Sequence, residues 1–281
     1  MRVRSEKQAA RGTSRQQVVR SKQREVRSGC TLSRISQLTS GFLLLASCLL
    51  PKATMAYEPG KFYYQKYFKP GEPREKVIAL TFDDGPGPFT IPILELLKKH
   101  HIRATFFMEG SQIEGYPKIA KQVVDAGHEV GNHTYNHFDY HKVKNAAPER
   151  LIHELDQTEQ SLERATGIHT KVVRMPHGYF NHTWLLPTLK EKGYALVHWS
   201  FGCDWMNKYQ DQPGHWRVVE TPEQKAEAYI HNAVPGGVFL FHDGGRHREK
   251  TLAAVTIVIE TLEAKGYHFV AAEDLFKDSK P

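Results

Sequence analysis

The chain has 281 residues, of which 40% are hydrophobic and 25% are charged, a composition that supports a soluble core and excludes a multi-span membrane protein. Its three cysteines are too few for a disulfide-stapled scaffold or a Cys-rich zinc module. Residues 1–56 hold 11 of the 38 Lys and Arg but only 2 of the 31 Asp and Glu, so the other 27 basic and 29 acidic residues leave no basic excess for binding nucleic acid.

Residues 1–40 are rich in Arg, Ser, Gln and Thr and show no apolar periodicity, which predicts a disordered segment. A ten-residue apolar run follows at 41–50. It is too short to span a bilayer but typical of the hydrophobic region of a signal peptide. The small residues Thr54 and Ala56 fit a cleavage site before Tyr57. We therefore expect a leader over 1–56 and a secreted or cell-envelope protein.

Two other interpretations of the leader stay open. The residues that end at Cys48 resemble a bacterial lipobox, which would anchor the protein through acylated Cys48, although Leu49 and Leu50 prolong the apolar run past it. The Arg-rich, acid-poor start also resembles an organelle transit peptide. Each of these interpretations leaves the leader outside the fold and gives a mature chain without an integral membrane domain. After cleavage at Ala56, Cys203 is the only cysteine left.

From residue 76 the chain alternates short apolar runs with helical stretches. Strands are predicted at 77–82, 104–108, 129–130, 171–173, 194–199, 237–241 and 267–270. Helices are predicted at 91–100, 116–126, 148–166, 184–192, 222–232 and 252–265. Seven such units indicate an α/β fold with a parallel sheet, either an open doubly wound sheet or a closed barrel. No repeat or linker interrupts them, so we expect one domain over 74–277, preceded by an aromatic-rich extension at 57–73.

Candidate site residues follow several of the predicted strands. Asp83 and Asp84 come directly after the first strand, and two adjacent buried carboxylates need a compensating cation or proton. With sixteen histidines in the chain, the pairs His133/His137 and His137/His141 are weak metal motifs by themselves. Because the carboxyl ends of parallel strands share one edge of a sheet, we expect these groups to lie close together.

These residues carry a resemblance to a known family. The string Thr-Phe-Asp-Asp-Gly-Pro at 81–86 and His-Thr-Tyr-Asn-His at 133–137 resemble the first two motifs of the polysaccharide deacetylases, the NodB-homology domain of carbohydrate esterase family 4. Residues 174–178 resemble the third motif, Asp204 and Trp205 part of the fourth, and residues 240–243 the fifth. The resemblance covers about residues 74–275 in family order, and it implies a distorted (β/α) barrel of seven to eight strands.

The resemblance also implies roles for single residues. It selects His133 and His137, with Asp84, as ligands of one divalent metal; this donor set suits zinc, with cobalt, manganese or iron as alternatives. Asp83 would be the general base, Arg174 its positioning partner and His242 the acid that protonates the departing amine. Leu240 and Trp205 would line the pocket for the acetyl methyl group. The backbone N–H around His177 would meet the oxyanion.

Two positions depart from the family pattern. His177 stands where the third motif usually has Tyr, a change of little consequence if only the backbone N–H acts there. Phe201 stands where the fourth motif usually has an Asp that tunes the acid histidine. Asp204 and Asp243 are the candidates to replace that Asp. Residues 206–220 follow the fifth strand at the active edge, and the length of this stretch predicts a loop that lines the substrate groove.

The expected function is hydrolysis of non-peptide carbon–nitrogen bonds. A secreted N-deacetylase would remove acetyl groups from N-acetylglucosamine units of peptidoglycan or chitin-type glycans. An O-acetyl esterase acting on xylan, and a glycan- or metal-binding pseudoenzyme, are the alternatives. The expected partner is an N-acetylated polysaccharide or oligosaccharide, with neither nucleic acid nor an obligate protein partner.

Overall fold

One sheet of eight parallel strands organises residues 57–72, 74–143 and 147–277, which are the residues described by this computed structural model. The predicted disordered leader, the apolar run, Cys48 and the cleavage site at Ala56 lie outside the described residues. The strands are β1 (Phe62–Tyr63), β2 (Val77–Asp83), β3 (Thr105–Met108), β4 (Glu129–Asn132), β5 (Val172–Val173), β6 (Ala195–Val197), β9 (Gly237–His242) and β10 (His268–Val270).

The sheet curls into a distorted (β/α) barrel, as predicted. Its order is β1-β6-β5-β4-β3-β2, and β9 pairs along nearly the whole length of β2. On the other edge of β2, β3 pairs with residues 81–83 and β10 with residues 77–79. Between β9 and the other edge of the sheet there is no full ladder, but two isolated bridges: Phe201 to Phe239, which is parallel, and Gln65 to Gly237, which is antiparallel.

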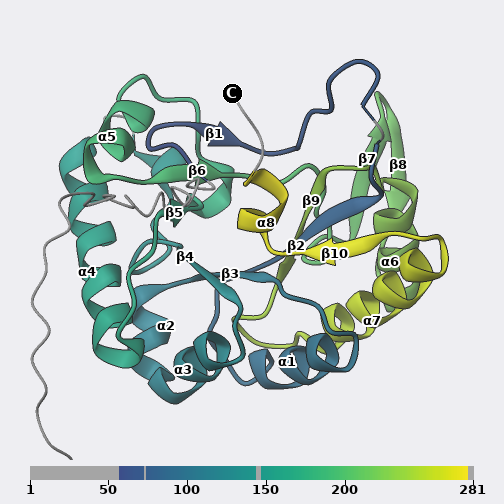
Figure 1. The fold of residues 1–281 in the computed structure, drawn as a ribbon, viewed down its shortest axis with the longest axis horizontal. Coiled ribbons are helices and arrows are strands. Elements are labelled where there is room, and N and C mark those ends of the chain that lie inside the picture. The colour runs from purple at the N-terminus through teal and green to yellow at the C-terminus, as the bar shows by residue number, and fades with distance from the viewer. Residues whose placement is uncertain (1–56, 73, 144–146, 278–281) are drawn as a thin grey trace, which may run out of the picture. The chain divides into compact units, whose positions relative to one another are not determined.

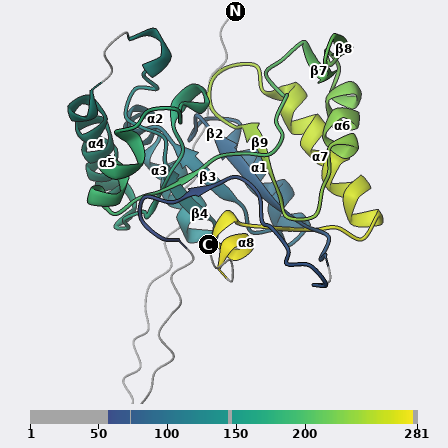
Figure 2. The ribbon, with the colours of Figure 1, turned by 90° about the horizontal axis from the view of Figure 1, so that it is seen from above.

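Helices surround the sheet (Figures 1 and 2): α4 and α5 flank one side and α6 and α7 the opposite side. Local chemistry fixes several helix ends. Pro148 begins α4, Gly167 ends it with φ of 79°, and Thr221 with Gln224 forms a capping box before α6. The helices are α1 (Thr90–Lys99), α2 (Gly110–Gly115), α3 (Pro117–Asp125), α4 (Pro148–Thr166), α5 (Leu185–Lys192), α6 (Pro222–His231), α7 (Glu249–Ala264) and α8 (Ala272–Phe276), with 3₁₀ turns at Tyr140–Lys142 and Pro176–Gly178. None of the helices in the described ranges has the length and apolar character needed to cross a bilayer.

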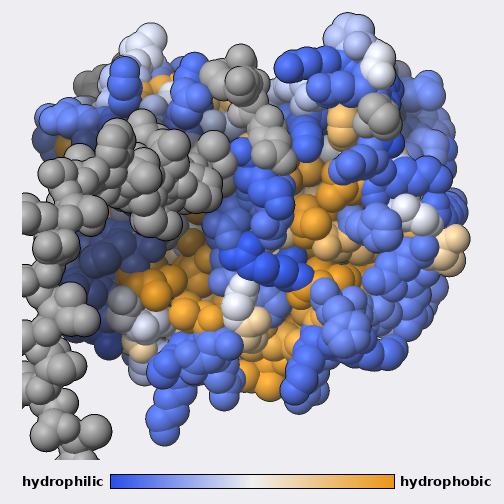
Figure 3. Space-filling view, viewed as in Figure 1, coloured by the Kyte–Doolittle hydropathy of each residue, from blue (hydrophilic) through white to orange (hydrophobic). Residues whose placement is uncertain are grey.

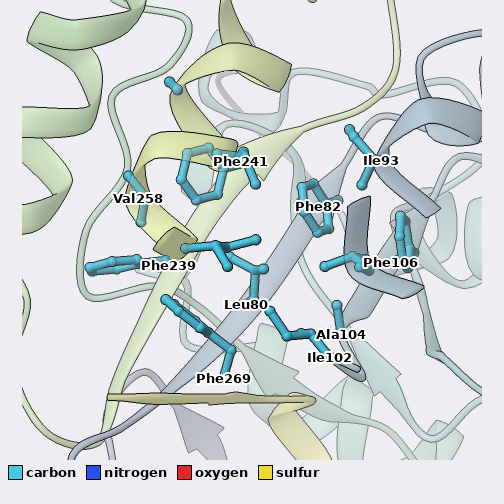
Figure 4. Close-up of a cluster of buried hydrophobic side chains, with 14 of the residues drawn as sticks. Leu80, Phe82, Ile93, Ile102, Ala104, Phe106, Phe239, Phe241, Val258 and Phe269 are labelled. Carbon is cyan, nitrogen blue, oxygen red and sulfur yellow. The ribbon is translucent and has the colours of Figure 1, made fainter. Parts of the chain in front are cut away.

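Alternation along the strands divides the core into two layers. Leu80, Phe82, Phe106 and Phe239 point outward and pack with α1 and α7, as Figure 4 shows. The ring centroids of Phe82 and Phe106 are 5.0 Å apart. Burying each such side chain contributes about 1.5–3 kcal/mol. The alternate positions point into the barrel, where they form a second cluster: Ala79, Phe107, Val172, Ala195, Val197 and Val238.

The amino end of the barrel is closed by α8 and Tyr57. Leu275 and Phe276 of α8 belong to the inner cluster, together with Tyr57. In Figure 1, α8 lies over the middle of the barrel. Figure 3 shows apolar side chains among hydrophilic ones on the same face. The structure thus leaves the carboxyl ends of the strands as the edge where the predicted site residues lie.

An antiparallel hairpin and helix α2 are among the elements that the sequence did not predict. The antiparallel hairpin β7 (Lys208–Gln212) and β8 (His215–Val218) occupies the stretch predicted as a loop. Helix α2 precedes the predicted helix α3. The loop expectation at 206–220 was therefore wrong in secondary structure, because cross-strand pairing folds this polar segment without any apolar periodicity.

Candidate active site and metal centre

Strand alternation brings four predicted site residues to the interior of the barrel. Each follows an inward-facing residue by two positions or a multiple of two: Asp83 after Ala79, and Arg174 after Val172. The same pattern turns His133 and His242 inward at the ends of β4 and β9. These side chains meet because parallel strands end at the same edge. The prediction of a shared edge is thereby confirmed geometrically.

Arg174 is completely buried and fixes Asp83. Its Nη1 donates to Asp83 Oδ1 at 2.7 Å and to Thr81 Oγ1 at 2.7 Å. Its remaining donors reach the carbonyls of Val197 at 3.1 Å and His198 at 2.9 Å. A buried ion pair holds only when its other hydrogen-bonding groups are satisfied as well, and here both ends are held by the barrel wall. Burial lowers the pKa of Arg174, and the charge of Asp83 opposes this effect.

Asp84, His133 and His137 form a cluster that could hold a metal ion. Asp84 Oδ1 lies 3.4 Å from Nε2 of each histidine. This oxygen is buried and accepts no hydrogen bond from the described residues, which is the arrangement expected of a ligand atom. Nδ1 of His133 lies 2.7 Å from the carbonyl oxygen of Arg174, a contact that leaves Nε2 available for coordination. The donor set therefore fits a divalent cation.

The backbone at this cluster is unusual. Asp84, His137 and His177 have φ of 71°, 54° and 55°, in the left-handed region, which is uncommon for residues other than Gly although Asn, Asp and His are enriched there. The turn at Asp84 lets two consecutive carboxylates contact different partners: Asp83 contacts Arg174, and Asp84 lies near His133 and His137. Strain of this kind is maintained where the surroundings fix it, and it concentrates at functional sites.

Charges around the cluster determine its titration. Burial alone would raise the pKa of Asp84, but contact with His133 and the charge of His242 lower it well below the usual range. Burial, then the charge of His133, lowers the pKa of His137 to about 4. For His133 the carboxylates of Asp83 and Asp84 outweigh burial and raise the pKa. The same negative charge would also attract a cation.

His242 is paired with Asp204 across the site. His242 Nδ1 lies 2.9 Å from Asp204 Oδ1, and its backbone N–H donates to Oδ2 at 3.0 Å. Burial opposes protonation, but the charge of Asp204 prevails and raises the pKa of His242 to about 9. Asp204 is thus the carboxylate that contacts His242, whereas Phe201 packs against Tyr209, Tyr229 and Phe239. Asp243 faces elsewhere and accepts a hydrogen bond from Thr90.

A cavity of about 340 Å³ joins these groups. Leu240, His177 and Trp205 are among the residues that line it, and the Trp205 ring meets His242 edge-on at 4.8 Å between centroids. His141 is absent from the lining, and its Nε2 lies 3.4 Å from the carbonyl oxygen of His177. A larger cavity of about 800 Å³ between α1 and α3 contains none of the predicted site residues.

Sequence reasoning missed three residues of the lining, namely Met175, Trp199 and Arg248. Arg248 Nη2 lies 3.6 Å from Asp84 Oδ2. Arg248 follows the fifth motif by several positions, so the motif did not point to it. The residues Gly244 and Gly245, and the nearby start of a helix, indicated only a turn. The proximity of Met175 and Trp199 to recognised motif residues was the one signal available for these two.

A (β/α) barrel with a buried carboxylate, a His–Asp pair and a group able to hold a metal at its carboxyl edge is an arrangement suited to hydrolysis. The chain belongs to the polysaccharide deacetylase family, whose model matches residues 70–197. The predicted family and the predicted class of enzyme, a carbohydrate deacetylase, are confirmed.

Named relatives agree with this assignment. A peptidoglycan-N-acetylglucosamine deacetylase of Bacillus cereus is 36% identical over 72% of this chain and 89% of its own length. A peptidoglycan-N-acetylmuramic acid deacetylase of Bacillus subtilis is 32% identical over 75% of this chain and 76% of its own length. A crystal structure of a peptidoglycan N-acetylglucosamine deacetylase in complex with 4-naphthalen-1-yl-N-oxidanyl-benzamide superimposes with a TM-score of 0.65. Its sequence is 30% identical, over 80% of this chain and 95% of that one.

Proposed function

We propose that this protein hydrolyses the acetamide of N-acetylhexosamine units in peptidoglycan and releases acetate. One observation carries the proposal: Asp83, fixed by Arg174, and His242, paired with Asp204, face the same cavity as the Asp84 cluster. Both relatives described above are named for N-acetyl sugars of peptidoglycan, which supports this polymer over chitin or acetylated xylan. The intact set of groups argues against a pseudoenzyme.

Asp84, His133 and His137 would hold one divalent metal, for which we propose zinc. When bound, the metal supplies Lewis-acid polarisation of the amide carbonyl and lowers the pKa of water. The protein's own part is orientation. His133 is held through Nδ1 by the Arg174 carbonyl, so the same residue that positions Asp83 also positions a ligand.

Asp83 would act as the general base. Arg174 engages its Oδ1, so Oδ2 remains on the side of the cluster, 3.7 Å from His133 Nε2. This oxygen takes a proton from the attacking water as the new carbon–oxygen bond forms. Asp83 is 2% exposed, so bulk water does not compete for the carboxylate.

His242 would act as the general acid. An amine leaves poorly until it is protonated, and His242, with a pKa of about 9, carries the necessary proton at neutral pH. Nδ1 is engaged by Asp204, so Nε2 gives up the proton as the carbon–nitrogen bond breaks. Leu240 and Trp205 would enclose the acetyl methyl group, and the N–H at His177 would stabilise the oxyanion.

The organisation of the chain follows from this role. Peptidoglycan lies outside the cytoplasmic membrane, so the enzyme must be exported to reach it. We propose that residues 1–56 are a leader removed before Tyr57, that 57–73 form an extension and that 74–277 form the deacetylase domain. N-terminal sequencing of protein from the native host should begin at or near Tyr57. A mature form that starts at acylated Cys48, or an uncleaved chain, would overturn this assignment.

Metal analysis combined with acetate release tests the proposal. The purified protein should contain about one equivalent of metal and release acetate from peptidoglycan. His133→Ala and His137→Ala should lose most of the metal, whereas the matched variant His141→Ala should retain it. Equal loss in all three variants would show that the ligand pair is wrong. Absence of acetate from peptidoglycan, chitin oligomers and acetylated xylan would overturn the proposed activity.

A further inference from the structure

The β7–β8 hairpin borders a second, open groove beside the catalytic cavity. This groove has a volume of about 600 Å³, and Trp199 lines both it and the catalytic cavity. The two spaces are therefore adjacent, with Trp199 between them. The other residues that line the groove are Ser200, Phe201, Gly202, Met206, Asn207, Lys208, Tyr209, Gln210 and Trp216.

Two exposed indoles line these spaces, Trp205 the catalytic cavity and Trp216 the groove. Trp205 is 42% exposed and lies over Gly202, where a Cβ atom would come within 3.1 Å of its ring. Trp216, on β8, is 56% exposed. Large apolar side chains exposed in a groove next to a catalytic cavity indicate a binding surface, and flat aromatic faces suit the apolar face of a sugar ring. Tyr209 by contrast is buried and packs against Phe201, so it supports the hairpin from beneath.

The groove also carries a positive charge. Lys208 Nζ lies 5.1 Å from the centroid of the Trp216 ring. No carboxylate of the described residues lies within 4 Å of Lys208, whereas the neighbouring Arg217 is paired with Asp211. The ammonium group of Lys208 is therefore available to a ligand, and its position over Trp216 directs it to the surface where a sugar would stack.

We propose that this groove binds the sugar unit next to the one that is deacetylated, and that Lys208 favours glycans in which this neighbouring unit carries a carboxylate. This inference rests on the proposed function and adds a preference to it. Trp216 would stack on the neighbouring ring whatever its charge. Lys208 would pair with a carboxylate substituent, which alternating acidic glycan strands offer and a neutral N-acetylglucosamine polymer lacks.

Steady-state kinetics on two soluble glycans of equal length test the proposal. One is a peptide-free peptidoglycan strand, whose alternate sugars carry a lactyl carboxylate, and the other is a neutral chitin oligomer. Trp216→Ala should raise KM about tenfold on both, with kcat unchanged. Lys208→Met should raise KM about two- to fivefold on the acidic strand only. This difference should vanish at about 1 M salt, where the Debye length falls to about 3 Å.

Matched controls separate these effects from general damage. Tyr116→Ala removes an exposed aromatic ring, and Lys118→Met removes an exposed charge, both outside the groove. Neither should change KM on either glycan. Hydrolysis of a small activated acetyl ester, which cannot reach the groove, should be unaffected by Trp216→Ala and Lys208→Met.

The outcomes distinguish this inference from the function on which it rests. If the wild-type protein deacetylates both glycans but Trp216→Ala leaves KM unchanged, the groove does not bind the neighbouring unit. If Lys208→Met raises KM equally on both, Lys208 does not select a carboxylate. If the wild-type protein deacetylates neither, the proposed function itself fails.

Discussion

Two buried carboxylates at opposite ends of the same barrel are stabilised in different ways. Asp83, at the carboxyl edge, faces the guanidinium of Arg174. Glu129, at the amino edge, forms no ion pair with any residue that the structure describes. Tyr57 and Thr105 donate hydroxyl hydrogen bonds to it at 2.8 and 2.6 Å, and the backbone N–H of Glu273 donates at 3.0 Å.

The difference shows what a buried carboxylate needs in order to stay charged. Hydroxyl and amide donors satisfy hydrogen-bonding capacity, but they do not compensate the loss of hydration of a full charge. Burial therefore raises the pKa of Glu129 to about 7, and the donors from Thr105 and Tyr57 only moderate the rise. At Asp83 the guanidinium of Arg174 supplies a positive charge at 2.7 Å, which no hydroxyl group can do.

The largest expected effect is on catalysis at the carboxyl edge of the barrel, where Asp83 lies. Asp83→Asn keeps the shape and removes the proton acceptor, so kcat should fall by at least about 10²–10⁴-fold while the metal is retained. Acetate release and metal content measured on the same preparation check this. Loss of metal in parallel with activity would instead make Asp83 a ligand.

Removal of the positive charge of Arg174 should destabilise the folded protein at the same carboxyl edge. Arg174→Met leaves Asp83 buried and unpaired, so the free energy of unfolding should fall by about 3–5 kcal/mol in urea denaturation. Adding Asp83→Asn to this variant should recover much of that loss, because no charge is then left without a partner. A cost as small as that of the exposed substitution Lys118→Met would contradict the comparison.

At the amino end the expected effect is a pH dependence of stability. The pKa of Glu129 is raised from 4.5 in the unfolded chain to about 7 in the folded one, so between these values the folded state binds more protons. The contribution of Glu129 to stability is therefore present below pH 4.5 and lost as the pH rises through about 7, by about 3 kcal/mol in all. Glu129→Gln should flatten that part of the profile. An unchanged slope would show that Glu129 does not titrate there.

The smallest effect concerns the acid of the active edge. Asp204→Asn removes the charge that holds a proton on His242 and should move the alkaline limb of kcat/KM from near pH 9 downward by about one unit or more. The limb moves to lower pH because a donor with a lower pKa loses its proton at a lower pH. An activated acetyl ester, whose leaving group needs no proton, serves as the control. An alkaline limb at the same pH in both proteins would exclude His242 as its origin.

Much of the fold could be predicted from the sequence. The seven predicted strands are present with small shifts at their ends, since each combines a short apolar run with a turn residue. The elements that escaped prediction lack such a pattern. Strand β1 has two residues and exists only by pairing with β6, and β7 has a single buried residue, Tyr209. Helix α8 has five residues and is held by docking into the amino end of the barrel.

The sequence by itself placed Asp83, Asp84, His133 and His137 at strand ends in short contiguous motifs, and the family resemblance of these motifs predicted the base and the ligands. The tertiary structure alone decided which distant residues pair with the buried charged groups. Asp204 meets His242 across 38 residues, and Tyr57 meets Glu129 across 72. Local sequence fixes which face of a strand a side chain occupies, since alternation is a local property. Which charged side chains then face one another depends on barrel closure, and closure is the combined result of packing between strands and helices that are distant in the sequence.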